Sequence, residues 1–249
     1  MTRPVEVFPD HEQLARRAVE LIEAAVEAGR AERGRAIVGL SGGSTPRRTY
    51  ELLSERGSLS GADVEVFFGD ERCVPPTDHA SNYKLVADTI GDAGNVRRIR
   101  AEIDPDEAAR EYEALLRDRF GDGPPAFDLM LLGMGSDGHT ASLFPDSPEL
   151  SERERWVVAT RKEHGWVRRV TLTLPVLNAS RKTLMLVTGR DKAKAVADML
   201  GGGSSPAARV LGAHLLIDED AGGAPAPPKR KRPPTEELLD LSSEGDPEA

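Results

Sequence analysis

The sequence predicts an α/β protein, in which a mostly parallel β-sheet carries helices on both faces. Short runs rich in valine, isoleucine and leucine alternate along the chain with helical patterns, an order typical of parallel sheets. Most of these runs are apolar at successive positions, as expected of strands buried on both faces. The strand candidates, in chain order, are 35–40, 64–70, 127–135, 169–174, 182–189 and 214–218.

Helices are predicted between these strands from amphipathic spacing and end signals. The segment 10–29 opens on an acidic cap and keeps its apolar residues on one side. The segment 104–121 has a proline at its start and a glycine at its end. A third helix is predicted over 190–200, directly after a strand. Strand and helix therefore alternate up to the last predicted strand.

Composition separates a folded domain from a tail. We expect residues 1–221 to form one domain, because 39% of the chain is hydrophobic and can build a core without a disulfide or metal. Residues 222–249 are dense in proline, glycine and charge and cannot bury a core. The basic run 229–232 suits a nucleic-acid patch or a targeting signal, but a solvated tail is the simpler interpretation.

Charge and cysteine content bound the partners and the compartment. The single cysteine, Cys73, excludes an intrachain disulfide and fits a reducing compartment. The N-terminus lacks a secretion signal, and no apolar run reaches the ~20 residues of a membrane span. We expect a cytoplasmic protein without membrane contact. The net charge of −9 argues against nucleic acid, so an anionic ligand would need local cations.

The loop after the first predicted strand is suited to an anion. Gly42 and Gly43 allow a ligand close to the backbone, and Ser44 and Thr45 supply hydroxyls and amides at the start of a helix. We expect a phosphate here; a glycine turn with a Ser/Thr cap is the alternative. The spacings GxxxxGK[ST] and GxGxxG are both missing, so no nucleotide cofactor is predicted.

Charged residues also follow the second strand. Asp70, Glu71 and Arg72 stand in a row, and we expect Asp70 and Arg72 to be site residues, with a solvated loop as the alternative. The neighbouring Cys73 is interpreted as a bystander, because no histidine is near it in sequence.

The most informative loop is GMGSDGHT. It places His139 after a buried strand among three glycines, with Asp137 near enough to fix its ring. An unperturbed pKa of about 6.5 suits proton transfer at neutral pH, so His139 is the candidate general base. His11 and His164 are interpreted as surface residues. A serine nucleophile is not supported, because GxSxG is missing.

Two further cations are candidates for the same ligand. Lys192 falls in the first turn of a predicted helix, where a cation is unfavourable without an anion; a solvent-facing lysine is the alternative. Arg169 opens its strand and is a weaker candidate. No zinc or calcium spacing occurs, so no metal is predicted.

Taken together and in order, these motifs resemble the 6-phosphogluconolactonase family, within a superfamily that includes glucosamine-6-phosphate deaminases. The resemblance spans roughly residues 5–221. The matching stretches are 41–46, 69–75, 81–83, 133–145, 169–180 and 188–193.

The resemblance implies a Rossmann-like, doubly wound fold without a cofactor. It also implies hydrolysis of 6-phospho-D-glucono-1,5-lactone in the pentose phosphate pathway, with His139 as the base and the glycine loop and basic residues holding the phosphate. In this scheme Ser44, Thr45 and Lys192 anchor the phosphate, and backbone amides with Arg72 stabilise the oxyanion. We expect a monomer or a weak homo-oligomer whose partner is the small lactone.

Two other functions remain open. In the deaminases, a DGH motif is followed by an FNEP-like end, which has a glutamate just before the proline. In this chain Phe144 stands at that position, so the glutamate carboxylate is missing. Deaminases also tend to carry a tyrosine where this chain has Arg72. A non-catalytic sugar-phosphate-binding module would usually carry a helix-turn-helix, for which we find no spare segment.

Overall fold

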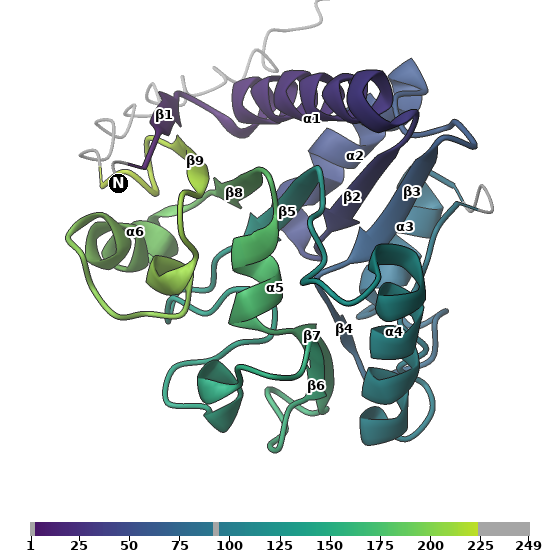
Figure 1. The fold of residues 1–249 in the computed structure, drawn as a ribbon. Helices are drawn as coiled ribbons and strands as arrows, with labels where there is room; N and C mark the ends of the chain where they lie inside the picture. The colour runs from purple at the N-terminus through teal and green to yellow at the C-terminus, as the bar shows by residue number, and fades with distance from the viewer. Residues whose placement is uncertain (1–2, 92–94, 224–249) are drawn as a thin grey trace, which may run out of the picture.

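The main sheet has six strands, all parallel to their neighbours (Figure 1). The computed structural model describes residues 3–91 and 95–223. Their α/β architecture confirms the predicted fold class. In spatial order the strands are β1 (Val5–Phe8), β9 (His214–Asp218), β8 (Thr183–Val187), β5 (Leu129–Gly133), β2 (Ala36–Leu40) and β3 (Val64–Phe68).

The direction of winding reverses between β2 and β5. From β2 the chain adds β3 on one side, whereas β8 and β9 are added on the far side of β5. The two strands at the reversal are hydrogen-bonded neighbours, with Val38 opposite Leu129. In doubly wound sheets the loops leaving such a pair of strands diverge and leave a crevice for a ligand. The glycine loop (residues 41–45) follows β2, and the histidine loop (residues 134–140) follows β5.

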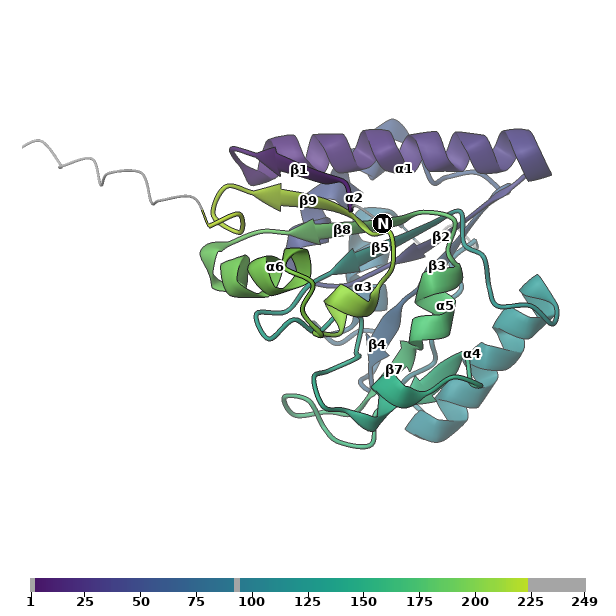
Figure 2. The same ribbon diagram turned by 60° about the vertical axis from the view of Figure 1, so that its left-hand side comes forward.

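Helices cover both faces of this sheet, as predicted. Figure 2 shows α1 along one face, with α5 and α6 on the opposite side. Asp10 caps α1, since its carboxylate accepts a hydrogen bond from the amide of Gln13 at 2.8 Å. The helices are α1 (His11–Arg33), α2 (Ser44–Arg56), α3 (Asn82–Thr89), α4 (Pro105–Phe120), α5 (Leu174–Ala179) and α6 (Ala193–Leu200). The short 3-10 helices are η1 (Pro148–Ser151), η2 (Arg190–Lys192) and η3 (Ala207–Arg209).

A second, antiparallel sheet is separate from the main one and lies below it in the view of Figure 1. It consists of β4 (Asp70–Arg72), β7 (Arg169–Leu172) and β6 (Val157–Ala159), with β7 in the middle. The strand predicted over 169–174 therefore forms, but in this small sheet. The strand predicted over 64–70 is in fact two strands, because the chain leaves the main sheet at Gly69, whose amide still donates to Leu40 at 2.9 Å.

Within the described ranges, no helix is long and apolar enough to span a bilayer. Of the predicted tail, only Gly222 and Gly223 are described; residues 224–249, with the basic run, lie outside the described residues.

Candidate active site

A cavity of about 230 Å³ opens at the carboxyl ends of β2 and β5. Its walls come from segments that are far apart in the sequence but meet at this edge of the sheet. Asp137 is the one predicted site residue that does not line it. The other nine do: Gly42, Gly43, Ser44, Thr45, Asp70, Arg72, His139, Arg169 and Lys192.

Asp137 instead holds the imidazole of His139. Nδ1 of His139 lies 2.6 Å from Oδ1 of Asp137, and the backbone amide of His139 donates to the same oxygen at 3.0 Å. Partial burial opposes ionisation of Asp137, but the hydrogen bonds and charge of His139 outweigh it and lower the pKa of this carboxyl. Because a carboxylate only accepts, it favours the tautomer with the proton on Nδ1, which leaves Nε2 free to accept a proton.

The histidine loop (residues 134–140) is wound tightly around this pair. The amide of Gly135 donates to the carbonyl of His139 at 2.9 Å, and Gly138 donates back to Gly135 at 2.9 Å. A Cβ at Gly135 would lie 2.1 Å from Nδ1 of His139. The imidazole therefore occupies space that a side chain at position 135 would take.

We expect Gly135→Ala to lower the turnover of this site by at least tenfold, because the added methyl group must push the imidazole away from Asp137. The measurement is kcat with the substrate proposed below, with the Tm of both proteins. Gly123→Ala is the control, since a Cβ at this exposed position meets no atom within 4 Å. Unchanged turnover in Gly135→Ala would contradict the role of this packing.

Two guanidinium groups face the cavity from the small sheet. Arg72 and Arg169 are directly opposite each other in the β4–β7 ladder. Neither forms an ion pair with a carboxylate of the described residues, and Nε of each is buried without a hydrogen-bond partner. Burial and the charge of Arg72 lower the pKa of Arg169, although the negative charges of Asp70 and Glu71 oppose this shift. Two neighbouring cations that form no direct ion pair attract an anion to this part of the cavity.

Asp70 is buried and belongs to a hydrogen-bond network that was not predicted from the sequence. Its Oδ2 accepts from the hydroxyl of Ser142 at 2.6 Å, and its Oδ1 accepts from Nδ2 of Asn82 at 3.1 Å. The carboxamide of Asn82 also lies against Gly42, where a Cβ would be 1.7 Å from Oδ1. From the sequence, Gly42 is predicted to allow a ligand close to the backbone. In the structure, Asn82 alone already requires a glycine there.

Glu71 is not part of a solvated loop. It is buried and accepts hydrogen bonds from the hydroxyl of Ser81 and from the amides of Arg72, Asn82 and Tyr83, at 2.7–3.0 Å. Burial raises the pKa of its carboxyl. Through its hydrogen bonds, Glu71 connects β4 to the start of α3.

Burial also raises the pKa of the nearby Cys73 to about 11, which suits a bystander and not a nucleophile.

The glycine loop (residues 41–45) presents an uncapped helix start. Gly43, the N-cap of α2, has a φ of +106°, and no side chain caps the first amides of this helix. The hydroxyls of Ser44 and Thr45 are thus not caps: that of Thr45 lies 2.9 Å from the hydroxyl of Thr188. Free amides at a helix start attract an anion. Lys192 lies beside them, with Nζ 2.8 Å from the exposed Asp191, so it already has one counterion.

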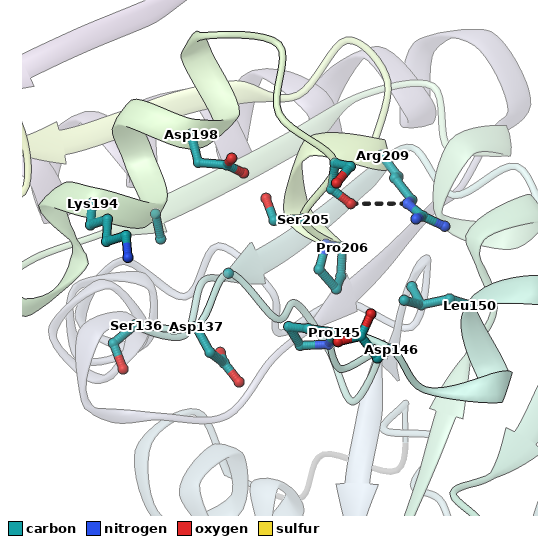
Figure 3. Close-up of a pocket in the computed structure, with 13 residues that line it drawn as sticks. Ser136, Asp137, Pro145, Asp146, Leu150, Lys194, Asp198, Ser205, Pro206 and Arg209 are labelled. Carbon is teal, nitrogen blue, oxygen red and sulfur yellow. Dashed lines mark hydrogen bonds between the residues drawn. The ribbon is translucent and has the colours of Figure 1, made fainter.

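A larger pocket, of about 390 Å³, lies behind the histidine loop. Figure 3 shows Asp137 on one side of it, Lys194 and Asp198 of α6 on another, and Pro206 between Ser205 and Pro145. Here the chain buttresses the loop, since the amide of Ala207 donates to Gly138 at 3.0 Å. No histidine lines this pocket, so the acid–base group faces the smaller cavity.

His164 is not the surface residue that the sequence suggested. Its ring is partly buried and stacks on Phe144, with centroids 3.5 Å apart and planes 7° apart. Burial, followed by the charge of Arg169, lowers the pKa of this imidazole. The other ring against Phe144 is that of His139, at 4.5 Å. This contact could not be predicted from the sequence, because it depends on how the hairpin between β6 and β7 folds.

Within residues 3–91 and 95–223, no three or more His, Cys, Asp or Glu side chains lie close enough together to hold a metal ion.

This fold and this site define an α/β protein with a histidine–aspartate pair and an anion-attracting cavity at the switch point of a parallel sheet. The chain belongs to the family of glucosamine-6-phosphate isomerases and 6-phosphogluconolactonase, whose profile matches residues 9–217. The resemblance drawn from the motifs is confirmed.

Individual relatives agree along most of the chain. It is 36% identical to the 6-phosphogluconolactonase of Nostoc sp. over 209 residues, which cover 80% of this chain and 85% of the relative. It is 40% identical to human 6-phosphogluconolactonase over 204 residues, covering 76% and 78%. The solved 6-phosphogluconolactonase from Trypanosoma cruzi matches with a TM-score of 0.81 and 25% identity, covering 90% and 97%.

Proposed function

We propose that this chain is a 6-phosphogluconolactonase, a carboxylic ester hydrolase that converts 6-phospho-D-glucono-1,5-lactone to 6-phospho-D-gluconate in the oxidative pentose phosphate pathway. One observation carries the proposal beyond family membership: the imidazole held by Asp137 lines the same cavity as two neighbouring arginines that form no ion pair within the described residues. A phosphorylated ester needs both features, a base for the water and positive charge for its phosphate and for the oxyanion formed at its carbonyl.

The chemistry is general base catalysis on an activated ester. Nε2 of His139 takes a proton from a water molecule as that water attacks the C1 carbonyl carbon. The C1–O5 bond then breaks, and the imidazolium returns the proton to the departing ring oxygen. Asp137 holds the ring in the correct tautomer and stabilises the imidazolium. Catalysis of this kind contributes about 10²- to 10⁴-fold.

The remaining residues bind and orient the lactone. The uncapped amides of α2, with Ser44, Thr45 and Lys192, hold the phosphate at one end of the cavity. Arg72 faces the carbonyl and stabilises its oxyanion together with loop amides. Arg169, beside Arg72, adds positive charge, and Gly42, Gly43 and Asp70 shape the wall between them. Fixing the phosphate keeps the carbonyl next to His139. No metal or cofactor takes part in this scheme.

The family also includes deaminases, and Phe144 argues against that activity here. It stands where the deaminase motif has a glutamate, and its ring packs against His139 at 4.5 Å. Among the described residues, the carboxylate that contacts the ring of His139 is that of Asp137. A second carboxylate for opening an amino-sugar ring is therefore missing.

Two assays test the proposal together. We expect the protein to accelerate proton release from freshly prepared 6-phosphogluconolactone above its spontaneous hydrolysis, and to release no ammonia from glucosamine 6-phosphate. Ammonia release would identify a deaminase. Thermal stabilisation by the lactone without added proton release would identify a binding module. Either result would overturn the proposed function.

We further infer a cytoplasmic protein that acts on a small molecule and not on nucleic acid, as a monomer or weak homo-oligomer. The net charge of −9 and the single cysteine support this view.

A further inference from the structure

The hairpin between β6 and β7 is connected to the cavity through Arg169, which opens β7 and lines the cavity. Its arms are joined by the amide of Thr160, which donates to Arg169 at 2.8 Å, and by that of His164, which donates to Val167 at 3.0 Å. Near its tip Trp166 is 60% exposed. His164 points the other way, onto Phe144. The hairpin thus has one outward and one inward ring.

The inward ring belongs to a cluster of three aromatic side chains, in which His164 stacks on Phe144 and His139 contacts Phe144 at a tilt. His164 covers one face of Phe144 at 3.5 Å and nearly parallel, so no other ring fits on that face. His139, at 4.5 Å and tilted by 37°, must lie on another side of the phenyl group. Phe144 itself is only 7% exposed. It therefore contacts both imidazoles, and the guanidinium of Arg169 also lies over its ring, with Cζ 5.5 Å from the centroid.

The electrostatic setting favours stacking over charge for His164. Burial and the nearby guanidinium of Arg169 lower the pKa of this ring, which keeps it neutral at neutral pH. Stacked aromatic pairs add stabilisation beyond that of the area they bury. The backbone carbonyl of His164 also accepts from Nη2 of Arg169 at 3.2 Å. The carbonyl stays in place through the hairpin's own hydrogen bonds, whatever the side chain.

We propose that His164 is a positioning residue: by stacking on Phe144 it fixes the plane of the His139 imidazole at the cavity. Asp137 holds one atom of that imidazole, Nδ1, and a single hydrogen bond leaves rotation about it possible. Contact with the ring of Phe144 limits this rotation, and the stacked imidazole of His164 helps to hold that ring in place. In its kinetic consequences this inference rests on the proposed function; in its geometry it does not.

The experiment compares His164→Ala, His164→Phe and Trp166→Ala in the full chain. Lactone hydrolysis gives kcat and KM, and the ¹H–¹³C NMR signals of the His139 ring report its surroundings without substrate. We expect His164→Ala to lower kcat about tenfold, with KM changed less than twofold, and to shift the His139 signals. His164→Phe, which keeps a flat ring on Phe144, should restore both. Trp166→Ala on the same hairpin should change neither.

Two outcomes would overturn the inference. One is a His164→Ala protein with unchanged kcat and unchanged His139 signals. The other is a His164→Phe protein as slow as His164→Ala, which would give the imidazole a chemical role in place of stacking. If the wild-type protein fails to hydrolyse the lactone, the proposed function fails, but the NMR comparison still decides the positioning of His139.

Discussion

Replacing His139 with alanine is expected to lower kcat for lactone hydrolysis by about 10²- to 10⁴-fold, the usual contribution of a positioned general base. Affinity for the product, 6-phosphogluconate, should change little, because the anion-attracting groups at α2, Arg72 and Arg169 are left intact. The measurement is stopped-flow proton release with the spontaneous rate subtracted, together with calorimetric titration of the product.

The matched control for this experiment is His79→Ala. The side chain of His79 is 90% exposed and lies outside the cavity lining, so its removal should leave kcat and affinity unchanged. Near-normal turnover in His139→Ala would refute the assignment of the base. A loss of product binding of the same size as the loss of kcat would assign His139 to binding instead.

Replacing Arg169 with methionine is expected to lower kcat/KM by about 10- to 100-fold, the effect of losing a hydrogen-bonded charge opposite an anion. Its stability should move the other way. The guanidinium is desolvated, lacks a carboxylate partner and has a buried, unbonded Nε. An apolar side chain of similar length removes this desolvation cost, so the Tm should stay the same or rise. Kinetics and thermal unfolding on one preparation test both.

Arg161→Met serves as the control, because Arg161 is an exposed arginine on the same hairpin. It should leave both activity and Tm unchanged. If Arg169→Met loses several degrees of Tm along with its activity, the contact of Arg169 with the carbonyl of His164 is a structural tie, and the case for an anion-binding role weakens.

The elements that sequence predicts best are those whose own residues determine them. Strands such as Thr183–Val187 are buried throughout. Helix α1 begins after its predicted acidic cap at Asp10, although it continues to Arg33, beyond the predicted end at Gly29. The three-residue strands β4 and β6 could not be foreseen, because they exist only through pairing with β7. The edge strand β1 is four residues long and half exposed, too short for a period to be recognised.

The same distinction applies to the site. Gly42, Ser44, His139 and their neighbours were identified because loop chemistry and strand ends are visible along the chain. Asn82 and His164 were not, since each acts through a residue more than ten positions away. The pairing of Arg72 with Arg169, 97 positions apart, likewise depends on a ladder that no local pattern announces. What sequence reasoning missed is therefore the support behind the candidate residues.

The pairing of β1 with β9 has a consequence for how the protein is made. Residues 5–8 leave the ribosome early, but in the main sheet their hydrogen-bonding neighbours are residues 215–218. At translation speeds of about 5–20 residues per second, the first strand waits roughly 10–40 s for its partner. Completion of the sheet must therefore wait until β9 has been made, and a nascent chain arrested before residue 214 would leave the backbone hydrogen-bonding groups of β1 without this partner strand.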